Sequence, residues 1–152
     1  MSHSPRVLEI IADHQALEGP LLPILHAVQA EYGHIPQDAL PVIALGLNIS
    51  RAEVHGVMSF YHDFREEPAG RHVLKLCRAE ACQAMGANTL ATQAKSRLGV
   101  DWHGTTANGA VTLEPVFCLG LCACGPAAML DGRVIGHVTA ARIDALAQEC
   151  GA

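Results

Sequence analysis

The sequence predicts an α+β protein in which a small helical bundle precedes an α/β domain. Three observations support this fold class. Apolar residues recur at helical spacing in the first part of the chain, short β-type runs flank one helix in the second part, and five of the six cysteines lie between Cys77 and Cys124. With 152 residues, half of them apolar, the chain can form a real hydrophobic core.

The first two predicted elements are amphipathic helices. Residues 5–19 end in a glycine and carry the expected apolar stripe Val7, Leu8, Ile11 and Leu17. A second helix follows Pro20 and stops at Gly33, a residue type that commonly ends helices. Its apolar residues, at offsets of 0, 4, 7 and 11, are Leu21, Leu25, Val28 and Tyr32.

Two further helices complete the predicted bundle. One lies around residues 37–45, and the next begins after Ser50, which fits a capping box with Glu53. Because these helices are short, their apolar stripes must pack on one another. We therefore expect a helical bundle over residues 1–66.

A linker at 65–70 leads to a domain of different character over residues 70–152. Strands are predicted at 72–77, 110–117, 127–130 and 133–137, and helices at 88–98 and 139–149. Pro115 places the second strand at an edge or a bend, and Asp131-Gly132 is a strong hairpin signal. The order β-α-β-β-β-α resembles a thioredoxin-like α/β sandwich.

Composition and charge narrow the function classes. The formal charge is −5, with 10 Lys and Arg against 15 Asp and Glu, which argues against a nucleic-acid or membrane-surface binder. The apolar stretches are too short to cross a bilayer, and no signal-peptide pattern is found, so we expect no membrane insertion and a cytoplasmic location. No Gly-rich nucleotide-binding motif and no H-E-x-x-H zinc motif occurs.

The cysteine spacing predicts a metal site. Cys77 and Cys82 have four residues between them, Cys118 and Cys122 have three, and 35 residues separate the pairs. Each pair begins where a predicted strand ends. Four thiolates in two pairs suit a [2Fe–2S] cluster, while structural zinc, disulfides and inert thiols remain alternatives. A thioredoxin-type dithiol enzyme is disfavoured because no C-x-x-C occurs.

At these residues the sequence resembles the thioredoxin-like [2Fe–2S] ferredoxin subunits of NAD-linked dehydrogenase complexes, a family that includes subunits of respiratory complex I and of NAD-reducing hydrogenases. The stretches that carry the resemblance are residues 21–26, 32–36, 50–57, 60–61, 118–122 and 125–126. Within the family, residues 77–83 and 122–127 are most similar to the gamma subunit of soluble NAD-dependent formate dehydrogenases.

The resemblance implies that Cys77, Cys82, Cys118 and Cys122 bind one [2Fe–2S] cluster per chain. Cys124 departs from the pattern of many relatives, but only Cys122 preserves the three-residue spacing. Cys150 lies on the apolar side of the last predicted helix and is interpreted as a small buried hydrophobe.

The resemblance also implies a role. The chain would be an electron-transfer subunit without substrate chemistry of its own, exchanging single electrons with a flavin (FMN) subunit that binds NAD. In the formate dehydrogenase assignment, a molybdenum-containing subunit oxidises formate to carbon dioxide, and further Fe–S clusters belong only to partner subunits. The alternatives are the equivalent subunit of complex I or of an NAD-reducing hydrogenase diaphorase module and, ranked lower, a structural zinc-binding interaction module.

Overall fold

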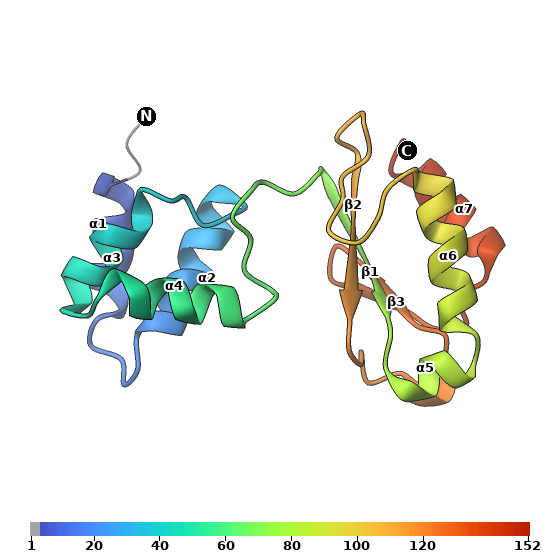
Figure 1. The fold of residues 1–152 in the computed structure, drawn as a ribbon, viewed down its shortest axis with the longest axis horizontal. Coiled ribbons are helices and arrows are strands. Elements are labelled where there is room, and N and C mark those ends of the chain that lie inside the picture. Colours follow the sequence, from blue (N-terminus) through green and yellow to red (C-terminus); the bar gives the residue numbers. More distant parts are fainter. Residues whose placement is uncertain (1–3) are drawn as a thin grey trace. The chain divides into compact units, whose positions relative to one another are not determined.

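The computed structural model describes residues 4–152, and the chain divides into two compact units, Met1–Pro68 and Ala69–Ala152 (Figure 1). Among the described residues, the first unit contains helices and no strand, and the second contains a four-stranded sheet with helices, so the α+β class is confirmed. The division falls in the segment 65–70 that the sequence predicts as a linker. No helix among the described residues is long and apolar enough to cross a membrane.

The first unit is a bundle of four short helices. They are α1 (Ser4–His14), α2 (Leu21–Tyr32), α3 (Ala39–Leu47) and α4 (Arg51–Phe60). Their apolar stripes meet in one core, in which the fully buried side chains include Val7, Ile24, Leu25, Val28, Ile35, Ile43 and Val54. Short helices are marginal alone, so this mutual burial is what stabilises them.

Two predicted helix boundaries of the bundle are confirmed. Helix α2 ends at Gly33, which has a φ of 75° and donates its N–H to the Gln29 carbonyl at 2.7 Å. At the start of α4, the Ser50 hydroxyl accepts a hydrogen bond from the Glu53 N–H at 3.1 Å, and the Glu53 carboxylate accepts one from the Ser50 N–H at 2.7 Å.

The first predicted helix was wrong at its end and in part of its stripe. Helix α1 stops at His14, and residues 15–19 form turns and bends. Leu8 and Leu17 are 54% and 49% exposed, whereas Ile10 is buried. The buried face follows the i, i+3, i+4 spacing of Val7, Ile10 and Ile11, and Leu8 lies off this face.

The second unit is built on a mixed sheet with strand order β2-β1-β3-β4. The strands are β1 (His72–Cys77), β2 (Val111–Val116), β3 (Ala128–Leu130) and β4 (Arg133–Ile135). Strand β1 pairs in parallel with β2 and antiparallel with β3. Pro115 lies in β2, an edge strand, and Asp131-Gly132 connects the β3–β4 hairpin, as predicted.

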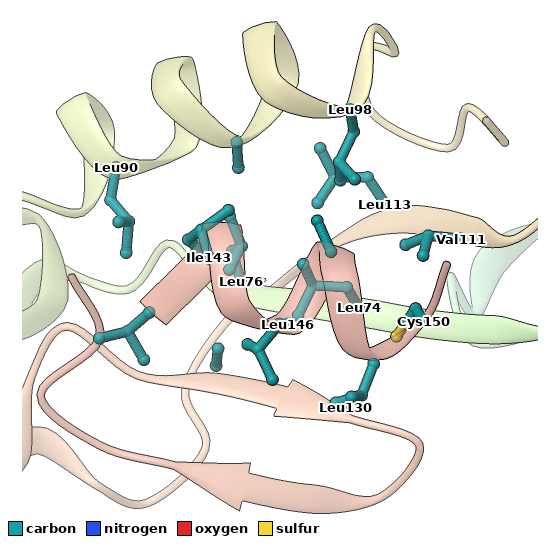
Figure 2. Packing of buried hydrophobic residues seen from close by; sticks show 14 of the residues in the cluster. Leu74, Leu76, Leu90, Leu98, Val111, Leu113, Leu130, Ile143, Leu146 and Cys150 are labelled. Atoms are coloured by element: carbon teal, nitrogen blue, oxygen red, sulfur yellow. The ribbon is translucent and has the colours of Figure 1, made fainter. Parts of the chain in front are cut away.

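Helices α6 (Ala87–Leu98) and α7 (Ala140–Glu149) cover the sheet and form its core (Figure 2). Buried side chains of the two helices meet those of β1, β2 and β3, among them Leu74, Leu76, Leu90, Leu113, Leu130, Ile143 and Leu146. A short helix, α5 (Glu80–Ala84), follows β1, and a 3-10 helix spans Cys122–Cys124.

Candidate metal centre

Two parallel strands bring the cysteine loops together. Cys77 is the last residue of β1, and it lies in register with Val116, the last residue of β2. The Arg78 N–H extends this pairing by donating to the Val116 carbonyl at 2.8 Å. Because the carboxyl ends of parallel strands lie at the same edge of a sheet, the loop after β1 and the loop that contains Cys118 start side by side.

The first pair of thiols is buried. Cys77 and Cys82 are 3% and 2% exposed, and they belong to the same small cluster of buried residues. Cys82 lies in α5, which follows β1 after a two-residue connection. The strand end and the short helix thus place two sulfur atoms next to each other inside the unit.

The second pair is exposed to solvent. The Sγ atoms of Cys118 and Cys122 are 3.6 Å apart, and the Gly120 N–H donates to the Cys118 sulfur at 3.4 Å. Two thiolates bound to one tetrahedral metal at about 2.3 Å are about 3.8 Å apart. The separation in this pair therefore suits two ligands of one metal atom.

The two pairs face each other. Leu119 and Leu121 of the opposite loop pack against the buried cluster that contains Cys77 and Cys82. A Cβ added at Gly125, beyond the second pair, would lie 3.5 Å from the Cys82 sulfur. Apolar side chains surround the buried pair, namely Ala79, Ala87, Val116, Leu119, Leu121 and Ala127.

The thiols differ in acidity. Burial of Cys77 disfavours its thiolate, but hydrogen bonds from the Ala79 N–H, the Cys82 thiol and the opposite loop outweigh it and hold the pKa of Cys77 below its ordinary value. Burial, together with the neighbouring Cys77, raises the pKa of Cys82. The hydrogen bond and the charge of Cys118 raise the pKa of Cys122. Cys77 is thus the thiol that ionises first of these three.

The arrangement fits the donor set of a [2Fe–2S] cluster. Such a cluster takes two thiolates on each iron, N–H groups that donate to sulfur, and apolar surroundings that limit water. The chain provides two cysteine pairs, an N–H donor to the Cys118 sulfur from Gly120 and an apolar lining. Within residues 4–152, no group of three or more His, Cys, Asp or Glu side chains is already placed to hold a metal ion.

The other two cysteines, Cys124 and Cys150, lie outside the two pairs. Cys124 ends the 3-10 helix and contacts Gly136, where an added Cβ would be 2.8 Å from the Cys124 Cβ. Cys150 is 6% exposed and packs in the sheet core near Leu130 (Figure 2), in agreement with its interpretation as a small buried hydrophobe. Burial, with the charges of Asp131 and Glu149, raises the pKa of Cys150.

Three features of this site were not predicted from the sequence. Helix α5 has five residues, and the 3-10 helix has three, so neither shows a readable periodicity. Cys118 has a φ of 86°, a left-handed conformation that non-glycine residues rarely adopt and that is found at functional sites. No residue pattern signals this conformation in advance.

Comparison with known proteins finds the family that the sequence resembles. Residues 7–151 match the family described as thioredoxin-like [2Fe–2S] ferredoxin. The chain is 37% identical to an NADH-quinone oxidoreductase subunit of Rhizobium meliloti (strain 1021) over 126 residues, which cover 83% of this chain and 75% of the relative. It is 29% identical to the NADP-reducing hydrogenase subunit HndA of Solidesulfovibrio fructosivorans over 143 residues, or 94% of this chain and 84% of that subunit.

A solved structure shares the fold. The crystal structure of NAD⁺-reducing [NiFe]-hydrogenase in the air-oxidized state superimposes with a TM-score of 0.70 at 24% identity. The match covers 84% of this chain but only 22% of the hydrogenase chain, so it concerns the fold of one part of that chain.

Proposed function

Because the chain belongs to the thioredoxin-like [2Fe–2S] ferredoxin family and so carries one [2Fe–2S] cluster, we propose that it is the electron-transfer subunit of an NAD-dependent formate dehydrogenase. It exchanges single electrons with the FMN subunit of that complex and has no substrate chemistry of its own. When bound, the cluster supplies one-electron redox chemistry, which complements the two-electron chemistry of a flavin and NAD.

Cys77, Cys82, Cys118 and Cys122 are the proposed ligands. The observation that carries this assignment is the meeting of the two cysteine pairs at one edge of the sheet, where a Cβ at Gly125, just after the second pair, would lie 3.5 Å from the Cys82 sulfur. The 3.6 Å separation between the Cys118 and Cys122 sulfur atoms supports the second pair. Neither Cys124 nor Cys150 belongs to the proposed ligand set.

This chain's own residues do three things in the proposed role. The four thiolates hold the cluster, and the Gly120 N–H donates to the Cys118 sulfur. The apolar lining excludes water from the buried pair. The exposed pair, Cys118 and Cys122, provides the side from which a partner subunit can approach.

The formate dehydrogenase assignment is supported by the residues around the ligands. Segments 77–83 and 122–127 resemble the gamma subunit of soluble NAD-dependent formate dehydrogenases. The proposed partners are an FMN-containing, NAD-binding diaphorase subunit and a molybdenum-containing catalytic subunit that converts formate to carbon dioxide. The reaction of the complex would be formate + NAD⁺ → CO₂ + NADH.

A second candidate is the equivalent subunit of complex I or of an NAD-reducing hydrogenase diaphorase module. The NADH-quinone oxidoreductase relative from Rhizobium meliloti and the hydrogenase relative HndA favour it. The two candidates differ in the partner subunits and share the same cluster chemistry.

Metal analysis with electron paramagnetic resonance (EPR) tests the cluster assignment. Protein purified without oxygen should contain about two irons and two sulfides per chain. It should be EPR-silent as isolated in the oxidised state and show a spin-half signal after reduction with dithionite. About one zinc and no sulfide would refute the electron-transfer role and support the zinc module.

Isolation of the native complex tests the formate assignment. The chain, tagged and recovered with its bound subunits from its own cells, should bring down molybdenum and FMN and catalyse NAD⁺ reduction by formate. NAD⁺ reduction by hydrogen, or quinone reduction by NADH, in a complex without molybdenum would refute the formate assignment and leave the cluster assignment standing.

A further inference from the structure

Arg78 directly follows Cys77, and its guanidinium group is only partly hydrogen-bonded. Its Nε atom is buried and has no hydrogen-bond partner within residues 4–152. The guanidinium lies over the Trp102 ring, with Cζ 5.4 Å from the ring centroid, and its Nη2 is 3.4 Å from the Asn88 amide oxygen. Because buried polar atoms are nearly always hydrogen-bonded, this orphaned Nε calls for an explanation.

A second cation on the same ring provides a comparison. The Lys95 ammonium lies 4.6 Å from the Trp102 centroid, but it also forms an ion pair with Asp101 at 2.5 Å. Arg78 has no carboxylate partner in the part of the chain that the structure describes. Of the two cations on Trp102, one is therefore neutralised by a neighbour and the other is not.

The backbone of Arg78 fixes this charge relative to both cysteine loops. Its N–H donates to the Val116 carbonyl at the end of β2, and its carbonyl accepts a hydrogen bond from the Gln83 side chain at 2.7 Å. Gln83 directly follows Cys82 in α5. Two hydrogen bonds of the Arg78 backbone thus connect it to β2, which precedes the second cysteine pair, and to α5, which contains Cys82.

We propose that Arg78 adjusts the reduction potential of the cluster by placing an uncompensated positive charge beside it. This rests on the proposed ligand set. Reduction adds one electron to a cluster that four thiolates already make anionic, and net charge is one of the factors that set iron–sulfur potentials. An arginine cannot lose its proton, so its charge favours the reduced state at every physiological pH.

The expected size follows from Coulomb's law. Arg78 and Cys77 are adjacent, so the guanidinium lies within about 12 Å of the nearest ligand sulfur. At this distance and an effective dielectric constant of about 20, one unit charge changes the ratio of reduced to oxidised cluster by about ten-fold at fixed ambient potential. Screening by solvent and salt makes this change smaller, and we expect it to remain at about three-fold or more. Exposed Glu80, two residues away, acts in the opposite direction.

An EPR-monitored redox titration of the full chain tests the proposal. We expect Arg78→Gln to lower the reduced-to-oxidised ratio at the wild-type midpoint by about three- to ten-fold. Lys95→Gln removes the same net charge from the same ring. It should cause a smaller change, because the Lys95 ammonium pairs with Asp101, which is 82% exposed, so solvent screens its charge more than that of Arg78, whose Nε is buried. Arg78→Lys keeps the charge and should stay within two-fold of the wild type.

Three results would overturn the proposal. They are a change below three-fold in Arg78→Gln with the cluster intact, an equal change in Lys95→Gln, or a change beyond two-fold in Arg78→Lys. If Arg78→Gln does not assemble a cluster, Arg78→Lys keeps the proposal open to refutation, since a change beyond two-fold would overturn it. A lower melting temperature with an unchanged ratio would assign Arg78 a structural role only. A wild-type chain without iron and sulfide would instead refute the proposed function.

Discussion

The Cys77–Cys82 pair is almost completely buried, whereas the Cys118–Cys122 pair, on the adjacent loop, is exposed. Both pairs begin at the carboxyl ends of parallel neighbouring strands, so the sheet alone does not cause the difference. The cause is the segment that comes after each strand. The short helix α5 places Cys82 among apolar side chains, while the second loop reaches Cys122 through bends and irregular backbone.

The backbones of the two loops differ in the same way. The first pair lies on regular structure, the end of β1 and the helix α5. In the second, Cys118 has a φ of 86°, Gly120 has a φ of 76°, and Cys122 starts a 3-10 helix. The comparison indicates that the first loop shields its sulfur atoms from water, and the second loop presents its sulfur atoms to the outside.

Removal of a thiol from the buried pair should have the largest effect. We expect Cys82→Ala to abolish the cluster, because the site then retains three thiolates and the iron that Cys82 binds loses half of its cysteine ligands. Iron and sulfide content and the visible spectrum measure this. Cys150→Ser, a substitution in the core of the same unit, should retain the cluster. A fully assembled cluster in the Cys82 variant would refute the ligand assignment.

Within the exposed loop, two cysteines separated by one residue should behave differently. Cys122→Ala should lose the cluster, while Cys124→Ala should keep about two irons per chain, because only Cys122 lies 3.6 Å from the Cys118 sulfur. Iron analysis and EPR of both variants check this. The reverse result would make Cys124 the ligand and change the geometry of the exposed pair, while leaving the buried pair as assigned.

The sequence was sufficient to predict the elements that follow a repeated pattern. The capping box of Ser50, the Gly33 stop, the edge position of Pro115 and the Asp131-Gly132 hairpin are confirmed because each depends on local chemistry. The end of α1 was wrong because Ala16, Leu17 and Glu18 are good helix formers, yet the chain turns at residues 15–19, ahead of Pro20.

For the site, the sequence indicated which cysteines are involved but not how they are arranged. Spacing and resemblance indicated the four cysteines, and the family of the resemblance is confirmed. Neither could indicate that one pair would be buried and the other exposed, because this depends on how α5 packs. The unpartnered Nε of Arg78 results from contacts with distant residues, such as Trp102, and has no local sequence signal.

A smaller effect on the cluster is expected from an added methyl group at Gly136, which contacts Cys124 in the exposed loop. A Cβ at Gly136 would lie 2.8 Å from the Cys124 Cβ and 3.1 Å from its carbonyl oxygen. Gly136→Ala should therefore destabilise the second unit by about 1–3 kcal/mol, as overpacking does. Thermal unfolding measures this, and the EPR signal should change in shape through displacement of the 3-10 helix.

Gly56→Ala in α4 is the matched control. Nothing lies within 4 Å of the added Cβ, and alanine in a helix interior is favoured over glycine by about 0.5–1 kcal/mol. This variant should be slightly more stable and have an unchanged EPR signal. Equal effects of the two substitutions would mean that the contact at Cys124 does not constrain the exposed loop.

The smallest effect is expected from a substitution at Asp131, which contacts the start of β1, the end that lies away from both cysteine pairs. Asp131 accepts hydrogen bonds from the Val73 N–H at 2.8 Å and from His72 at 2.7 Å. Burial opposes its ionisation, but these two partners outweigh it and hold the pKa of Asp131 below its ordinary value. A carboxyl with a lowered pKa stabilises the fold above its unfolded pKa of about 3.9, and this contribution is lost as the pH falls through the folded value.

Asp131→Asn should therefore lower the free energy of unfolding at pH 7 by less than about 1 kcal/mol, because the carboxyl is 45% exposed and solvent weakens the pair. Asparagine also tolerates the φ of 49° at this position and can still accept from the Val73 N–H. Urea unfolding from pH 7 to pH 3 should show that the wild type loses more stability than the variant below about pH 4, with the cluster signal at pH 7 the same in both. Parallel pH profiles would show that Asp131 does not contribute in its ionised form. A changed cluster signal would show that the two ends of β1 are coupled, so that burial of the first pair depends on the whole strand and not on α5 alone.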